Sequence, residues 1–203
     1  MRLALALLAS YLLGAIPTSF LAGKLFRGID LRKQGSGNLG ATNLYRTLGA
    51  KFAIPVGLLD MAKGAIPLMV IAPLASSSRY FAILCGIMAV VGHVFSVFVR
   101  FRGGKGVATA SGVMLGLTPW AVLVSLAVWL IVVRVSGYVS LGSMVGAVVL
   151  PVAAWVLHPL QRDIIWIQVV VALAIIWLHR ANIRRLLAGT ENRFGRRARP
   201  SSA

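Results

Sequence analysis

Residues 106–133 read GVATASGVMLGLTPWAVLVSLAVWLIVV, an uncharged stretch in which Thr118-Pro119 is the main interruption. A membrane-spanning helix needs about 20 apolar residues, so this stretch is long enough to cross a bilayer. Because proline lacks the N–H that a helix hydrogen bond requires, Pro119 predicts a break into two shorter helices. The number of membrane crossings in the chain depends on this dipeptide.

The rest of the 203-residue chain has the same character, with 59% hydrophobic and only 12% charged residues. This balance is far from that of soluble globular domains. The composition predicts an all-α polytopic integral membrane protein with one transmembrane domain, 1–191, and a basic, disordered cytoplasmic tail, 192–203. The other uncharged runs are 3–23, 80–99, 135–161 and 164–178.

Lysine and arginine cluster at the ends of these runs, with 6 in residues 24–51, 3 in 100–105 and 7 in 180–199. Basic loops favour the cytoplasmic side, so these segments should share that side, with the N-terminus outside and the C-terminus in the cytoplasm. This arrangement requires an odd number of crossings, and five or seven fit. A break at Pro119 gives about seven, some of them short, and places Arg134 inside and Arg162 outside.

The formal net charge of +17 does not indicate a nucleic-acid-binding protein, because the cations lie at membrane edges and not among exposed aromatic residues. The single cysteine, Cys85, lies within an apolar run and is read as a small buried hydrophobe. The three histidines and four acids are scattered over different loops, so no metal site is predicted.

The first of three polar interruptions runs from Gly35 to Arg46 and holds three glycines, two asparagines, a serine and a threonine. Glycine allows close backbone approach, the short polar side chains add donors, and arginine offers a fork for phosphate. By itself the segment would be read as a turn-rich loop. Its candidate anion-binding residues are Ser36, Asn38, Asn43 and Arg46.

The second interruption is Gly103-Gly104-Lys105-Gly106, directly before an apolar run. The first amides of a helix and its dipole favour a phosphate, with Lys105 as a point charge. The segment is not a Walker A loop, because Val107 stands where a hydroxyl is required and no strand precedes it. The nearby His93 is interpreted as a satisfied buried histidine.

The third interruption begins at His179, where the last apolar run ends. His179 and Asn182 are three residues apart and share a helical face, so they are a plausible catalytic pair. Arg184 follows on as a candidate substrate-binding cation, and Glu191 is expected to brace the site by pairing with a cation. Ser140 and Ser143 are expected at the same edge of the membrane as hydroxyl donors.

Two further features are read as structural. Asp60 and Lys63 lie three apart at membrane depth and should neutralise each other. The pairs Gly112/Gly116 and Gly142/Gly146 allow close helix packing, which is favoured within this chain over an oligomer interface.

The segments Ser36–Arg46, Gly92–Thr109 and His179–Glu191 together resemble the bacterial acyl-phosphate-dependent glycerol-3-phosphate acyltransferases, the PlsY family. The resemblance rests on three motifs in order that span nearly the whole chain, and it extends to Asp60–Gly64 and Tyr138–Ser143. One departure is Ser96, where many members of the family have proline.

The resemblance implies a seven-helix enzyme of the bacterial inner membrane with its active site on the cytoplasmic face. It implies transfer of an acyl group from acyl phosphate to the 1-hydroxyl of glycerol-3-phosphate, giving lysophosphatidic acid and inorganic phosphate in the first acylation of phospholipid synthesis. No cofactor is implied, and no protein partner can be inferred. By resemblance, phosphate is bound by Ser36, Arg46 and Lys105 with the backbone of Gly103, Gly104 and Gly106; His179 and Asn182 act on the hydroxyl and oxyanion; and Ser143 positions substrate.

Three questions stay open at this stage. The proton of the hydroxyl could leave on His179 or on the departing phosphate. An anion transporter or lipid-binding scaffold could use the same cationic loops, although the repeated halves typical of transporters are absent from the sequence. Transfer from a CDP-activated lipid would need clustered metal-binding aspartates, which the sequence lacks.

Overall fold

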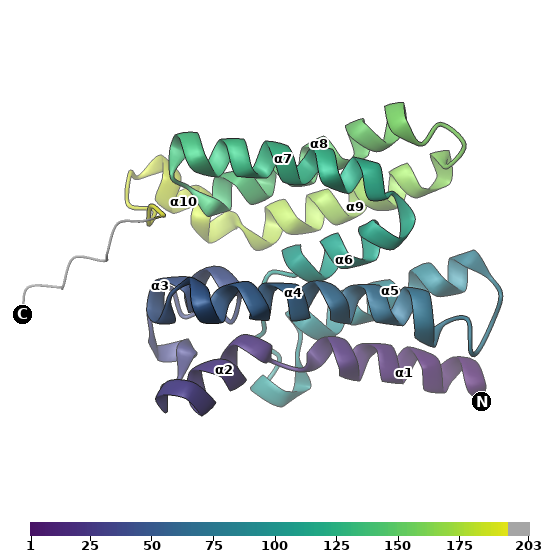
Figure 1. The fold of residues 1–203 in the computed structure, drawn as a ribbon, viewed down its shortest axis with the longest axis horizontal. Helices are drawn as coiled ribbons and strands as arrows, with labels where there is room; N and C mark the ends of the chain where they lie inside the picture. Colours follow the sequence, from purple (N-terminus) through teal and green to yellow (C-terminus); the bar gives the residue numbers. More distant parts are fainter. Residues whose placement is uncertain (195–203) are drawn as a thin grey trace, which may run out of the picture. The chain divides into compact units, whose positions relative to one another are not determined.

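The computed structural model describes residues 1–194, and every regular element within them is helical (Figure 1). The chain packs as two compact units, Met1–Leu117 and Thr118–Ala203. The predicted all-α architecture is confirmed. Unit 1 consists of α1 (Arg2–Ala15), α2 (Thr18–Arg27), η1 (Leu31–Lys33), α3 (Ala41–Leu48), α4 (Ala50–Ile66), η2 (Pro67–Ile71), α5 (Arg79–Val94), η3 (Val97–Val99) and α6 (Val107–Leu117). Unit 2 consists of α7 (Pro119–Ser136), α8 (Val139–Leu157), α9 (Arg162–Leu178) and α10 (Arg180–Leu187).

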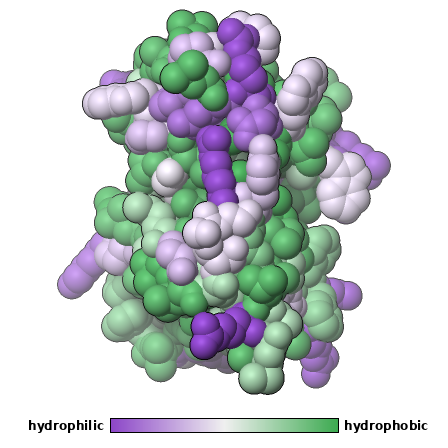
Figure 2. Space-filling view, turned by 90° about the vertical axis from the view of Figure 1, so that its right-hand side faces the viewer, coloured by the Kyte–Doolittle hydropathy of each residue, from purple (hydrophilic) through white to green (hydrophobic). Residues whose placement is uncertain are grey.

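Four helical segments of the described chain are long and apolar enough to cross a membrane, and six are if each of two bent pairs counts as one span. The bent pairs are α1 with α2, at 42°, and α9 with α10, at 56°. The apolar helix α6 is shorter. Figure 2 shows hydrophobic side chains over much of the face that it draws, with hydrophilic side chains gathered between them. The chain is an integral membrane protein, and the count of seven crossings stays a prediction.

Prolines set two of the helix boundaries. Pro119 is the first residue of α7, directly after the end of α6 at Leu117, which confirms the predicted break. Pro17 divides the first apolar run in the same way, because α1 ends at Ala15 and α2 begins at Thr18. The uncharged run 3–23 is therefore bent within its length and is not one straight helix.

Helices in unit 1 cross closely because glycines face neighbouring backbones. A side chain on Gly14 of α1 would collide with the Ala89 carbonyl of α5. A side chain on Gly112 of α6 would collide with the Met61 carbonyl of α4 in the same way. Such close approach lets helices associate by van der Waals contact where apolar burial gives little driving force. The predicted packing role of Gly112 within this chain is confirmed.

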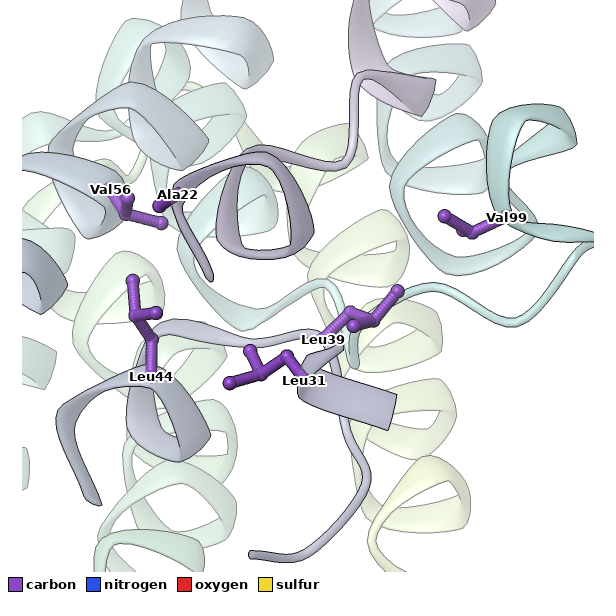
Figure 3. Packing of buried hydrophobic residues seen from close by; sticks show 6 residues of the cluster. All are labelled: Ala22, Leu31, Leu39, Leu44, Val56 and Val99. Atoms are coloured by element: carbon purple, nitrogen blue, oxygen red, sulfur yellow. The ribbon is translucent and has the colours of Figure 1, made fainter. Parts of the chain in front are cut away.

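A hydrophobic cluster in unit 1 anchors the first polar interruption (Figure 3). Leu31 and Leu44, near the two ends of the loop between η1 and α3, are fully buried. Val99 of η3, just before the second interruption, belongs to the same cluster. The two loops are therefore held by one core. The cluster consists of Ala22, Leu31, Leu39, Leu44, Val56 and Val99.

In unit 2, α8 packs against both α7 and α9. A side chain on Gly142 of α8 would collide with Val133 of α7, and Ser125 Oγ of α7 donates to the Gly146 carbonyl at 2.8 Å. The start of the predicted tail is tied to the turn after α7, since Phe194 N donates to the Gly137 carbonyl at 2.6 Å. The rest of that tail, 195–203, lies outside the described residues.

Candidate active site

The first loop is shaped by one buried side chain, that of Asn43 in α3, which is 2% exposed. Its Oδ1 accepts from Ser36 N at 2.9 Å, and its Nδ2 donates to the carbonyls of Gln34 at 2.9 Å and Leu31 at 3.3 Å. Gly35 has φ +57°, and a side chain there would collide with the Asn43 amide. The Asn43 amide therefore spans the loop and fixes its backbone.

The other three predicted anion-binding side chains of this loop are more accessible than Asn43. Ser36 is exposed, whereas Asn38 and Arg46 are half-buried. A further cation near this loop, Arg32, forms an ion pair with Asp30, since its Nη2 lies 2.7 Å from Asp30 Oδ2. The hydrogen bond from this guanidinium lowers the pKa of Asp30 to about 2.

The second loop packs its glycines directly on the end of α5. Gly103 N donates to the Val94 carbonyl at 3.0 Å, and Gly104 N donates to the His93 carbonyl at 3.1 Å. A side chain on Gly103 would collide with the His93 carbonyl. Gly106, with φ +75°, turns the chain into α6, which begins at the next residue. The half-buried Lys105 thus stands two residues before the first amides of α6, where helix geometry favours an anion.

The intramembrane charges Asp60 and Lys63 neutralise each other as predicted. Lys63 Nζ lies 2.8 Å from Asp60 Oδ1, and both side chains are at most 5% exposed. Thr18 Oγ1 also donates to Asp60 Oδ1, at 2.5 Å. Sequence spacing did not indicate this threonine, which comes from a different helix.

His179 lies at the bend between α9 and α10 and is 3% exposed. Its Nδ1 lies 2.8 Å from the Ile175 carbonyl. A carbonyl can only accept, so Nδ1 carries a proton, and when the ring is neutral Nε2 carries the lone pair. The ring can therefore accept a proton or a hydrogen bond at Nε2.

The carboxylate of Glu191 accepts hydrogen bonds from several polar side chains of unit 2. Its Oε1 accepts from Asn182 Nδ2 at 2.8 Å and from Ser140 Oγ at 2.9 Å, and its Oε2 accepts from Arg185 Nε at 2.7 Å. Burial of the carboxyl opposes ionisation, but the hydrogen bonds from Arg185, Asn182 and Ser140 outweigh it and hold the pKa of Glu191 below its ordinary value. The predicted pairing of Glu191 with a cation is present, and the cation is Arg185.

The other predicted residues of unit 2 lie apart from this cluster of hydrogen bonds. Ser143 Oγ donates to the Val139 carbonyl at 2.9 Å and accepts from Trp129 Nε1 at 3.4 Å. Arg184 is exposed on α10. No three His, Cys, Asp or Glu side chains of residues 1–194 lie together as a metal site would require.

The chain matches the family model described as glycerol-3-phosphate acyltransferase over residues 4–189. It is 48% identical to the glycerol-3-phosphate acyltransferase of Trichlorobacter lovleyi, over 91% of this chain and 94% of that protein. It is 40% identical to the corresponding enzyme of Chlorobaculum tepidum, over 94% of this chain and 97% of that protein.

Two solved structures are similar as well. One is PlsY, an integral membrane glycerol 3-phosphate acyltransferase, in its glycerol 3-phosphate form, with a TM-score of 0.88, 37% identity and 96% coverage of both chains. The other is the lysophosphatidic acid form of PlsY, with a TM-score of 0.84, 36% identity and 96% coverage of both chains. The three motifs, the membrane helices and these similarities agree, and the chain belongs to the PlsY family of glycerol-3-phosphate acyltransferases.

Proposed function

We propose that the acyl donor is acyl phosphate, and that the acyl group passes to the 1-hydroxyl of glycerol-3-phosphate. The hydroxyl oxygen attacks the acyl carbonyl carbon and forms the ester bond. The bond between that carbon and the phosphate oxygen breaks, so that lysophosphatidic acid and inorganic phosphate leave. The mixed anhydride is already activated, and the step requires no cofactor.

The observation that carries this proposal is that one hydrophobic cluster of unit 1 anchors two loops whose residues suit anion binding. Ser36 and Arg46 belong to the first loop, and Lys105 to the second. Val99 packs beside the second loop in the hydrophobic cluster that also anchors the first. Donor and acceptor would each carry one phosphate, and each loop suits one phosphate through cations and backbone amides. An adenine-bearing carrier would require a further site.

In unit 2, we assign the hydroxyl chemistry to His179 and oxyanion stabilisation to Asn182. The Nδ1 contact of His179 with the Ile175 carbonyl leaves Nε2 as the acceptor atom of the ring. Asn182 is held through its amide nitrogen by Glu191, which orients the side chain. Positioned donors of this kind stabilise developing charge without reorganisation during the reaction. Ser140 and Ser143 serve as positioning residues, and Arg184 as a surface cation for anionic substrates.

We further propose that the protein resides in the bacterial inner membrane with these loops on the cytoplasmic side. The support is the concentration of 6 basic residues in 24–51, 3 in 100–105 and 7 in 180–199. Glycerol-3-phosphate is a soluble metabolite, so a cytoplasmic site gives it direct access.

The decisive experiment gives the purified protein radiolabelled glycerol-3-phosphate with either acyl phosphate or acyl-coenzyme A, in metal-free buffer. Lysophosphatidic acid is expected with acyl phosphate alone, and inorganic phosphate is expected to inhibit. Product from acyl-coenzyme A at a comparable rate would overturn the donor assignment. If neither donor gives product while glycerol-3-phosphate still binds, the transporter or scaffold class is favoured.

A further inference from the structure

A buried polar cluster in unit 1 has no part in the chemistry described above. It consists of the buried Asp60 and Lys63 of α4 and His93 of α5, with the half-buried Thr18 of α2. Asp60 Oδ1 accepts from Thr18 and pairs with Lys63 Nζ at 2.8 Å, and it lies 3.8 Å from His93 Nδ1. An ion pair at membrane depth is costly unless each charge is satisfied, so a cluster of this kind calls for an explanation.

Lys63 connects the cluster to the break between α1 and α2. Lys63 Nζ donates to the Ile16 carbonyl at 2.8 Å. That carbonyl precedes Pro17, where the helix is interrupted. The lysine thus satisfies a carbonyl that the proline break releases, while it neutralises Asp60. Thr18 of α2 therefore binds Asp60, and the residue that follows α1, Ile16, binds Lys63.

The ring of His93 connects the cluster to the second loop, Gly103–Gly106. A side chain on Gly104 would collide with His93 Nε2, so the ring edge lies directly against the Gly104 backbone. The main chain of His93 contributes as well, because its carbonyl accepts from Gly104 N at 3.1 Å. His93 is 7% exposed, and the ring has Asp60 on its Nδ1 side and the loop on its Nε2 side.

We propose that His93 is a positioning residue for the glycine loop: its ring lies between Asp60 and Gly104 and supports the Gly104 backbone, so that Lys105 and the first amides of α6 are presented to a substrate phosphate. The inference rests on the proposed phosphate-binding role of that loop. It goes beyond the role of a satisfied core histidine, because it predicts a specific loss of phosphate affinity when the ring is removed.

The test compares His93→Ala with His93→Asn in purified protein. Asparagine keeps a donor on the Asp60 side but has no ring against Gly104, so it separates support of the fold from support of the loop. Three quantities are measured: the thermal unfolding midpoint, the KM for glycerol-3-phosphate with kcat, and the concentration of inorganic phosphate that protects half-maximally against thermal unfolding. His158→Ala serves as a control, since His158 lies in unit 2 at the end of α8.

Both His93 variants are expected to need at least about tenfold more phosphate for protection or to show a similar rise in KM, as misplacement by about 1 Å can cost 10²-fold. His93→Asn should unfold at a temperature closer to that of the wild type than His93→Ala does. Unchanged KM and phosphate protection in His93→Asn would overturn the positioning role, even if His93→Ala fails to fold.

Lys105→Ala in the same assays separates this inference from the proposal it rests on. If Lys105→Ala loses phosphate protection while both His93 variants keep it, the positioning role alone is wrong. If Lys105→Ala keeps both protection and turnover, the phosphate-binding role of the loop is wrong, and the inference is overturned with it.

Discussion

Asn182 and Ser140 donate to the same carboxylate oxygen, Glu191 Oε1, at 2.8 and 2.9 Å. These residues come from α10, from α8 and from the segment after α10. One buried carboxylate therefore sets the orientation of the amide to which we assign oxyanion stabilisation. Its other oxygen, bound by Arg185, fixes the carboxylate in turn.

Glu191→Gln is expected to destabilise the protein at neutral pH by on the order of 2 kcal/mol, since hydrogen bonds to charged groups are lost. The pKa of Glu191 is lowered in the folded state, so its stabilisation is complete above the ordinary value of 4.5 and is lost as the pH falls through the folded value. Thermal unfolding should therefore lose more stability on acidification in the wild type than in the variant. Parallel pH profiles for wild type and Glu191→Gln would contradict the prediction.

Lys105→Ala should lower turnover by roughly two to three orders of magnitude, the cost of removing one preorganised donor from a developing charge. Steady-state rates of folded, purified protein provide the measurement. Lys51→Ala is a matched control, because Lys51 is an exposed lysine in the first turn of α4. Near-normal turnover of the Lys105 variant would remove this lysine from the proposed site.

His179→Gln distinguishes the two routes for the hydroxyl proton. If His179 is the base, both glutamine and alanine variants should be nearly inactive, by at least about 10²-fold. If the leaving phosphate takes the proton and His179 only forms hydrogen bonds, His179→Gln should retain clearly more activity than His179→Ala. Rates of both variants decide between the routes, and wild-type rates in both would exclude His179 from the reaction.

Asn43→Ala should loosen the first loop, because three hydrogen bonds to the backbone at Leu31, Gln34 and Ser36 are lost together. Amide hydrogen exchange across this loop should accelerate by about tenfold or more, as each lost bond contributes about 1 kcal/mol. Gln34→Ala is the control, since it leaves the Gln34 carbonyl in place. Unchanged exchange in Asn43→Ala would show that the loop is held by its leucines alone.

The orientation in the membrane can be checked with single cysteines in a Cys85→Ala background. Gln34→Cys and Thr190→Cys should react only from the cytoplasmic side, and Leu160→Cys only from the outside. All three native positions are suitable because Gln34 and Thr190 are exposed and Leu160 is 95% exposed. Reaction of position 160 from the cytoplasm would rule out the seven-crossing arrangement.

Sequence alone predicted the features that depend on local chemistry. The break at Pro119 follows from the missing N–H, and the Asp60–Lys63 pair follows from helical spacing and the cost of lone charge in a membrane. The bend at Pro17 has the same cause, but the apolar run continues on both sides of this proline, so hydrophobicity alone does not mark the break.

Features that depend on distant contacts could not be read from the chain. Asn43 was expected to bind substrate, but the amide of a loop asparagine can serve the backbone equally well, and only the fold shows which groups it reaches. Likewise, the Ser96 hydroxyl donates to the Ala15 carbonyl, 81 residues earlier in the chain. Contacts at such separation leave no periodic signal in the sequence.

The shortness of α6 has a consequence for how the protein is made. With 11 residues at about 1.5 Å each, α6 is roughly 16 Å long, about half of the ~30 Å hydrocarbon layer. A newly synthesised segment of this length cannot be stable in lipid by itself. Gly112 allows it to lie against the Met61 backbone of α4, which leaves the ribosome earlier. We therefore expect α6 to leave the insertion machinery only as a partner of α4, so that the order of synthesis becomes the order of assembly.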